Sequence, residues 1–347
     1  MQCWSASYNA ILWQIRQNQQ MNSILPIFAG VVTWAAWSLA AVGQTAVPLG
    51  TSAAADNAPA NPAAESSSGD ALLRHVIAAV DSQPSISAKV RHRIDLLGHP
   101  LIGSGIYLQQ GRGPSRALRF DLNLQAGEKL ASMQQISDGK ELWISEEVGS
   151  HTRLSRVDVA RLARARPRSP LPPNAWLGLG GLPKLLSGIE GSFQFGTVAE
   201  SRLEDLPVWT IEGTWNRARL VQLLGDQKQA IEAGQPADLN KLAPNLPDRV
   251  VLHVGCDDFF PYRIEYWRAV PSSTAAGDAK AGGEQAGRMI LLMELYEVRL
   301  GATINPQEFA FKRGATKPLD RTQEFLDKFS LDDRLPEGAG QPRARRR

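Results

Sequence analysis

The stretch that decides the fold is Ile136-Ser137-Asp138-Gly139-Lys140-Glu141-Leu142-Trp143-Ile144. Its Asp-Gly pair stands between two runs with strand character, 130–137 before it and 141–146 after it. Both residues of an Asp-Gly pair tolerate a positive φ, which the tight turn between two antiparallel strands requires. The stretch therefore predicts a β-hairpin that turns at Asp138-Gly139.

The residues around the hairpin continue with a period of two. In 117–124, Leu118, Phe120, Leu122 and Leu124 share one face, and polar residues share the other. This alternation is typical of a strand with one buried face. Further strands are predicted at 86–90, 94–97, 102–108, 193–199, 208–215, 249–255, 262–269, 289–300 and 309–311. About ten strands with interspersed helices predict an α+β protein whose large antiparallel sheet curls over its helices.

Helical character is expected in three segments. Asp70 is a suitable N-cap, and apolar residues of 72–80 fall on one face by helical spacing until Gln83-Pro84 ends the pattern. The segment 157–189 has mixed helical and loop character, and 217–242 is expected to be a helical insertion.

Composition limits the class of protein. The chain has 347 residues, of which 43% are hydrophobic and 21% charged, so most of it should fold around a sizeable core. A net charge of +3 is too small for a dedicated nucleic-acid binder. Of the two cysteines, Cys3 precedes the expected processing site, so mature protein would keep only Cys256 and have no internal disulfide.

The N-terminal region indicates export. No charged side chain occurs in 17–55, and 24–42 is almost continuously apolar. We assign 1–46 as a signal peptide or an N-terminal membrane anchor, with a buried core helix as the remaining alternative. Ala, Ser, Pro and Asn dominate the region that follows, so 47–69 is expected to be a disordered linker. The folded domain is assigned to 70–328 and a disordered basic tail to 329–347.

Signatures of catalysis are missing from the sequence. The five histidines have no metal-ligand spacing, and no Gly-x-Ser-x-Gly elbow occurs. Acidic pairs at Glu146-Glu147, Glu204-Asp205 and Asp257-Asp258 each fall at an expected turn, where acidic residues are common. We therefore expect no enzyme activity, no metal and no cofactor.

Aromatic residues concentrate on or beside the expected strands. The tryptophans of this group are Trp143, Trp176, Trp209, Trp215 and Trp267. They are interpreted either as filling a core or as lining an apolar cavity between a curled sheet and its helices. The sequence favours the core and leaves the cavity open.

Several motifs occur in an order that resembles one protein family. The stretch 136–144 resembles an Asp-Gly-Lys-x-Leu-Trp hairpin of the bacterial lipoprotein-carrier superfamily, with its LolA/LolB-like fold. Gly105-Ile106-Tyr107-Leu108, Arg112-Gly113-Pro114 and Leu118-Arg119-Phe120 are similar to the strand, turn and aromatic strand that precede that hairpin. The segments 250–267 and 309–311 resemble its closing strands, so the resemblance covers residues 70–325.

The resemblance implies an open half-barrel with helices on its concave face, forming a lid over an apolar cavity for acyl chains. In this resemblance, Arg112 would lie near the position of the arginine that latches the lid in that family. The residues expected to touch the ligand are Leu118, Phe120, Trp143, Trp209 and Trp267.

The leading functional hypothesis is an exported protein that binds acyl chains of a lipoprotein or lipid and carries them across the periplasm. Contact with a membrane or membrane protein is expected, and contact with nucleic acid is not. An alternative is an envelope sensor or scaffold, anchored in the inner membrane by 24–42. An envelope hydrolase is a third hypothesis, for which no activity is proposed.

Overall fold

The computed structural model describes residues 68–96, 99–126, 129–167, 177–243, 246–269, 287–312, 314, 316–328 and 331–332. The expected signal or anchor, Trp176 and most of the expected linker and tail lie outside the described residues. In the part of the chain that the structure describes, no helix is both long and apolar enough to cross a bilayer.

The described strands form one large sheet, in the order β13-β6-β5-β4-β3-β2-β1-β12-β11-β10-β9-β8. Its first half comprises β1 (Ser85–Leu96), β2 (His99–Gln110), β3 (Ala117–Ala126), β4 (Lys129–Ser137), β5 (Glu141–Val148) and β6 (His151–Asp158). Its second half comprises β8 (Phe193–Leu203), β9 (Leu206–Trp215), β10 (Arg249–Gly255), β11 (Pro261–Ala269) and β12 (Gly287–Leu300).

Each half is an antiparallel meander, and the pairing of β12 with β1 joins the two. The exception to antiparallel pairing is β13 (Leu319–Asp320), which runs parallel to β6. The terminal strands β8 and β13 do not pair with each other, so the sheet stays open. The predicted α+β fold with an open, curled antiparallel sheet is confirmed.

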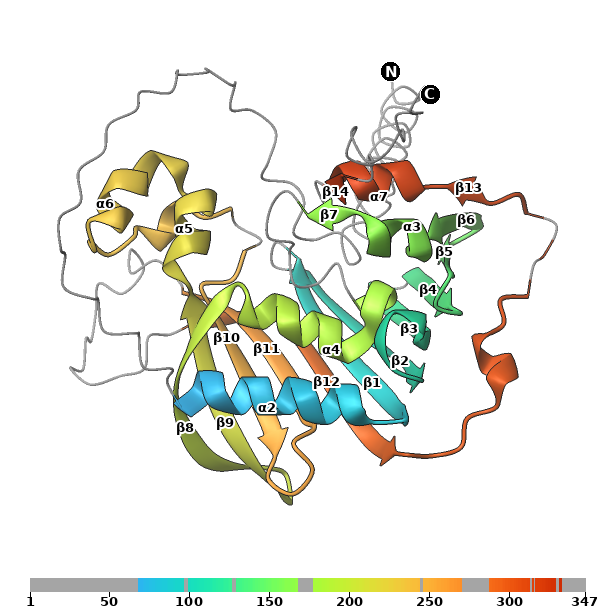
Figure 1. Ribbon diagram of the computed structural model, residues 1–347, viewed down its shortest axis with the longest axis horizontal. Helices are drawn as coiled ribbons and strands as arrows, with labels where there is room; N and C mark the ends of the chain where they lie inside the picture. Colours follow the sequence, from blue (N-terminus) through green and yellow to red (C-terminus); the bar gives the residue numbers. More distant parts are fainter. Residues whose placement is uncertain are drawn as a thin grey trace, which may run out of the picture.

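Two helices lie across one face of this sheet (Figure 1). They are α2 (Ser68–Ser82) and α4 (Leu177–Glu190), and we call the surface beneath them the helix-covered face. Both helices contribute almost fully buried side chains to the main core: Leu73, Val76 and Val80 from α2, and Leu182, Leu186 and Ile189 from α4. Alternate residues of the strands meet them, as the period of two in the sequence requires.

The start of α2 differs from the sequence prediction. The helix begins at Ser68 rather than after Asp70, so Asp70 lies in its first turn. The Asp70 carboxylate accepts a 2.8 Å hydrogen bond from the backbone N–H of Phe195 in β8. A residue expected to cap its own helix therefore fastens that helix to the edge of the sheet.

Smaller elements complete the fold. A second core joins β5 and β6 to α3 (Val159–Arg164) and α7 (Thr322–Lys328) through buried Leu142, Val157, Leu162 and Phe325. Beside it, β7 (Arg166–Pro167) pairs with β14 (Leu331–Asp332), which lies in the segment expected to be a tail. The expected insertion forms α5 (Arg217–Leu223), α6 (Lys228–Glu232) and the short 3-10 turns Gly225–Gln227 and Leu239–Lys241.

Two local predictions are wrong. Residues 309–311 form no strand, because Phe309 ends a 3-10 helix (Pro306–Phe309) that begins at a proline. Glu146 lies within β5 rather than at a turn, and it is buried. It is paired there with Arg153 of the neighbouring strand, at 2.5 Å between Oε2 and Nη2. A carboxylate can be buried where a cation on the adjacent strand compensates its charge.

The quoted hairpin forms as predicted, with Ile136 opposite Trp143. Gly139 has a φ of 85°, whereas Asp138 acts through its side chain, whose Oδ1 accepts hydrogen bonds of 2.8 Å from the N–H groups of Lys140 and Glu141. A Cβ on Gly139 would lie 2.6 Å from the carbonyl carbon of Ser115. The glycine is therefore required both for its φ and for the close approach of another backbone segment.

Replacing Gly139 with alanine should destabilise the fold more than the same change at Gly149. Gly149 also has a positive φ, 59°, but nothing lies within 4 Å of the position a Cβ would take. Gly149→Ala should cost about 1–2 kcal/mol from the left-handed conformation alone. Gly139→Ala should cost more, because the Ser115 backbone must also move. Urea unfolding of both variants measures this, and equal losses would contradict the close approach.

Candidate functional site

The helix-covered face is the candidate site, because it is the largest apolar surface that this fold assembles. Leu118 and Phe120 of β3 lie on it, and both are buried in the main core. A Cβ on Gly181 of α4 would come within 2.9 Å of Leu118 Cδ2, so α4 rests directly on this strand. The space between the helices and the sheet is occupied by side chains from both layers.

Trp209 lies at the rim of the same face. It is opposite Val254, a fully buried residue of the main core, so its side chain is on the helix-covered side of β9. Its ring lies 5.1 Å from that of Phe259, and Phe259 packs edge-on against His75 of α2 at 4.1 Å. Half-buried aromatic groups thus border the apolar layer where α2 crosses the sheet.

The other two predicted ligand contacts lie on the opposite face. Trp143 alternates with Leu142 and Ile144, which point into the second core, and its ring stacks on Phe311 at 5.0 Å. Trp267 follows Tyr266 of the main core, and its indole N–H donates to Glu265 Oε2 at 2.8 Å. The structure therefore brings together Leu118, Phe120 and Trp209, and it separates them from Trp143 and Trp267.

Charged pairs surround Trp267 on the opposite face. The Arg249 guanidinium lies 5.1 Å from the centre of the Trp267 ring and 3.1 Å from Glu212 Oε2. Arg263 Nη2 lies 2.9 Å from Glu294 Oε1, and Arg91 pairs with the same carboxylate. Around these strands the opposite face therefore presents ion pairs between neighbouring strands.

An arginine that the sequence analysis did not single out joins the two covering helices. Arg116 is only 5% exposed and lies just before β3. Its Nη2 contacts Asp81 Oδ1 of α2 at 2.5 Å, and its Nη1 donates to the carbonyl of Gly180 in α4 at 2.9 Å. Arg112, the predicted latch, is exposed and donates to the carbonyl of Ser82 at the end of α2. The residue that holds both helices is therefore Arg116.

The start of α4 is fixed by a second buried polar contact. The Tyr107 hydroxyl donates to Gln109 Oε1 at 2.7 Å and accepts from the backbone N–H of Leu182 at 2.9 Å. Burial raises the pKa of the Tyr107 phenol, so it remains protonated and can donate. Gly181 interrupts the helix with a φ of 69°, where a Cβ would lie 2.6 Å from the Tyr107 oxygen. We call Tyr107, Gln109, Arg116 and Gly181 the polar latch.

His92 is a buried titratable group on the helix-covered face, away from the polar latch. It is 6% exposed and stands opposite Gly103 on one side and Met293 on the other. Its Nδ1 has no hydrogen-bond partner among the described residues. Desolvation lowers the pKa of His92 to about 4, so the ring is neutral at neutral pH. Among the same residues, no group of three or more His, Cys, Asp or Glu side chains is arranged to hold a metal ion.

Sequence comparison finds no matching family model and no matching curated protein. Comparison of structures finds similar chains. A putative outer membrane lipoprotein-sorting protein domain from Vibrio parahaemolyticus is 8% identical, with a TM-score of 0.30 over 70% of this chain and 96% of that one. A LolA superfamily protein from Nitrosomonas europaea is 13% identical, with a TM-score of 0.24 over 69% of this chain and 97% of that one.

A further similar structure is the Pseudomonas aeruginosa MucA/MucB complex, at 12% identity and a TM-score of 0.32. The match covers 71% of this chain but only 61% of that one. The superfamily that the hairpin sequence resembles is thus represented among the similar structures, at low sequence identity.

Removing the Arg116 guanidinium should loosen the two covering helices. Arg116→Met is expected to lower the free energy of unfolding by about 2 kcal/mol, because hydrogen bonds to charged groups contribute about 1.5–3 kcal/mol. Arg112→Met is the matched control, and an exposed contact of this kind should cost less than about 1 kcal/mol. Hydrogen exchange should accelerate at the end of α2 and the start of α4 in Arg116→Met only. Equal effects of both substitutions would assign no special role to Arg116.

Acid should destabilise the fold partly through His92. The folded pKa of about 4 lies below the ordinary value of 6.5, so the unfolded chain binds the proton more readily. The contribution of His92 is fully present above pH 6.5 and is lost as the pH falls towards 4, by about 3 kcal/mol in total. His92→Leu should remove this part of the pH dependence, and His151→Leu at an exposed position should not. Urea unfolding between pH 7 and pH 4 would reveal the difference, and identical pH slopes for all three proteins would refute it.

Proposed function

We propose that this protein binds the acyl chains of a lipoprotein or lipid on its helix-covered face and carries them across the periplasm. The observation that supports the proposal is the pairing of a continuous apolar layer with a polar latch at one end of α4. Directional polar contacts of this kind fix the register of a covering helix, which apolar packing alone does not do. The same contacts suit a helix that must leave and return in one register.

The energies involved allow such an exchange. Burying an acyl chain of about ten methylenes contributes about 8 kcal/mol, at about 0.8 kcal/mol for each methylene. A neutral hydrogen bond contributes about 0.5–1.5 kcal/mol, and a charged one about twice that. Breaking the few hydrogen bonds of the polar latch and partly repacking the core both cost free energy. This cost is therefore comparable with the free energy gained by burying one acyl chain.

Export is part of the proposal. The uncharged run at 17–55 supports a signal peptide or anchor, followed by the linker that ends near the start of α2. Transfer through the periplasm would require no covalent step, only exposure of the apolar layer at the donor and acceptor membranes. In this proposal Leu118, Phe120 and Trp209 contact the ligand, and Arg116 takes the latch role first given to Arg112.

An envelope sensor or scaffold is the second candidate. It is favoured by one observation, that the apolar layer is filled by the protein's own side chains. In that case the covering helices would stay closed and another surface would meet a partner. N-terminal sequencing of the mature chain separates the candidates, because retention of 24–42 favours the anchored form and cleavage favours the carrier.

Lipid binding tests the carrier proposal directly. Native mass spectrometry of the exported full chain should show co-purifying lipid or lipopeptide, and a fluorescent fatty acid should bind saturably. Trp209→Leu should weaken that binding about fivefold, or about 1 kcal/mol. Trp267→Leu, on the opposite face, is the matched control and should leave it unchanged. A clean apo spectrum together with no fatty-acid binding would reject the carrier proposal.

A further inference from the structure

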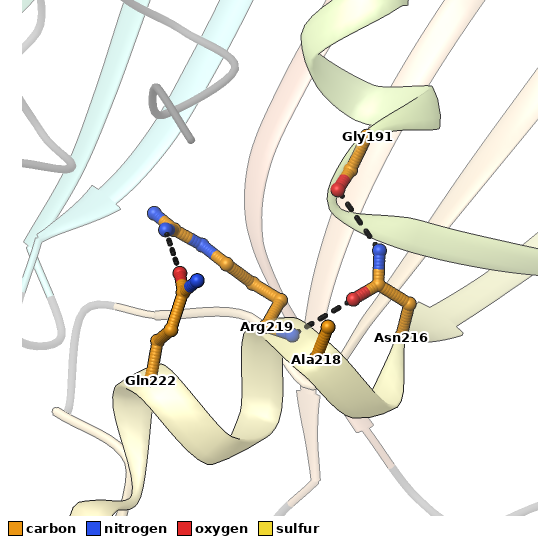
Figure 2. Close-up of a pocket in the computed structure, with 5 residues that line it drawn as sticks. All are labelled: Gly191, Asn216, Ala218, Arg219 and Gln222. Carbon is orange, nitrogen blue, oxygen red and sulfur yellow. Dashed lines mark hydrogen bonds between the residues drawn. The ribbon is translucent and has the colours of Figure 1, made fainter. Parts of the chain in front are cut away.

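A small pocket lies where the C-terminal end of α4 meets the first turns of α5 (Figure 2). Its volume is about 160 Å³. A cavity needs about 10–15 Å³ of this kind of volume to hold one water, so the pocket can hold several waters or a group of similar size. The lining residues are Gly191, Asn216, Ala218, Arg219 and Gln222.

The pocket is held in shape by hydrogen bonds among its own residues. Asn216 Nδ2 donates to the carbonyl of Gly191 at 2.9 Å, and its Oδ1 accepts from the N–H of Arg219 at 2.8 Å. Arg219 Nη1 donates to Gln222 Oε1 at 2.8 Å. Figure 2 shows Arg219 and Gln222 meeting on one side of the pocket, and Asn216 with Gly191 on the other. Both ends of the pocket are therefore positioned before any ligand arrives.

Charge is concentrated in one lining residue. Arg219 is only 7% exposed, and the other four lining residues are uncharged. Desolvation lowers the pKa of Arg219, which means that burial works against its positive charge. An anion in the pocket would favour the charged form and would meet a planar donor group suited to phosphate or carboxylate oxygens.

The pocket borders the apolar layer. Ile189, which is fully buried in that layer, lies two residues before Gly191, and Trp215, whose ring stacks on Phe193 at 4.2 Å, directly precedes Asn216. Directly after α5, Leu224 is buried in the main core. A ligand whose tail lies beneath α4 could thus place a polar group beyond the C-terminal end of that helix.

We propose that the pocket at Arg219 binds the phosphate or carboxylate group of an amphiphile whose acyl chains occupy the helix-covered face. This inference rests on the proposed function for the tail and adds an anionic headgroup to the ligand. Arg219 supplies the charge, and Asn216 and Gln222 orient the bound oxygens through their side-chain amides. The preferred ligand is therefore an acidic lipid or lipopeptide rather than an uncharged one.

The first experiment compares ligands on the full wild-type chain. The probes are a short-chain phosphatidylglycerol below its micelle concentration, the diacylglycerol of the same chain length, and inorganic phosphate, each titrated by calorimetry. The phosphatidylglycerol should bind at least tenfold more tightly than the diacylglycerol, a difference of about 1.4 kcal/mol. Failure of both lipids to bind would reject the carrier function. Equal binding of the two would reject the anion pocket alone.

The second experiment assigns the preference to the pocket. Arg219→Gln should abolish the tenfold preference while leaving the diacylglycerol affinity unchanged. Gln222→Glu should also abolish the preference, because it places a carboxylate beside the guanidinium. Gln222 is exposed, so this variant provides the test if Arg219→Gln does not fold. Lys228→Gln removes an exposed charge from the same insertion and should keep the preference. If both pocket variants keep it, Arg219 only stabilises the fold and the proposal is overturned.

Inorganic phosphate separates the two sources of the anion. Binding of phosphate to wild type that Gln222→Glu abolishes, without any lipid preference, would assign the pocket to a free anion and overturn the headgroup assignment. Weak or undetectable phosphate binding beside a clear lipid preference is the expected result, because the acyl chains supply most of the binding free energy.

Discussion

The antiparallel pairing of β1 with β12 is the interaction on which the rest of the structure depends. It joins residues that lie about two hundred positions apart, such as Val90 and Leu295, and so makes one sheet from two meanders. Only a sheet of this width offers a face on which α2 and α4 can both be buried. Without that pairing, each meander would expose half of an apolar surface, and neither helix would have a complete layer to cover.

The helix α4 that covers this surface is positioned by directional polar contacts. A helix held by apolar contacts alone could settle in several positions, because apolar contacts have little directional preference. Tyr107 and Arg116 give α4 directional contacts, and Gly181 lets the backbone approach them. In the proposed function, the same contacts are few enough to be broken when an acyl chain takes the place of the helix. Stability and exchange of a ligand can therefore share one surface.

The two faces of the sheet have separate roles. The helix-covered face is largely apolar, and its polar groups include the latch and buried residues such as His92. The opposite face carries ion pairs across neighbouring strands, among them Arg263 with Glu294. A tryptophan contributes to one or the other according to its position in the strand, so aromatic content alone says little about a ligand site.

The sequence by itself determined the local structure. The Asp138-Gly139 turn, the period of two in β3 and the helical spacing of 72–80 follow from backbone preferences and from burial of one face, which act over a few residues. It could not decide on which side of the assembled sheet Trp143 and Trp267 lie, because that depends on which face the helices cover. Nor could it identify Arg116, whose partners in α2 and α4 come together only when both helices pack on the sheet, or show that Arg219 is buried, which depends on how α5 packs. Only the tertiary structure brings such groups together, since burial and pairing are properties of the packed layers.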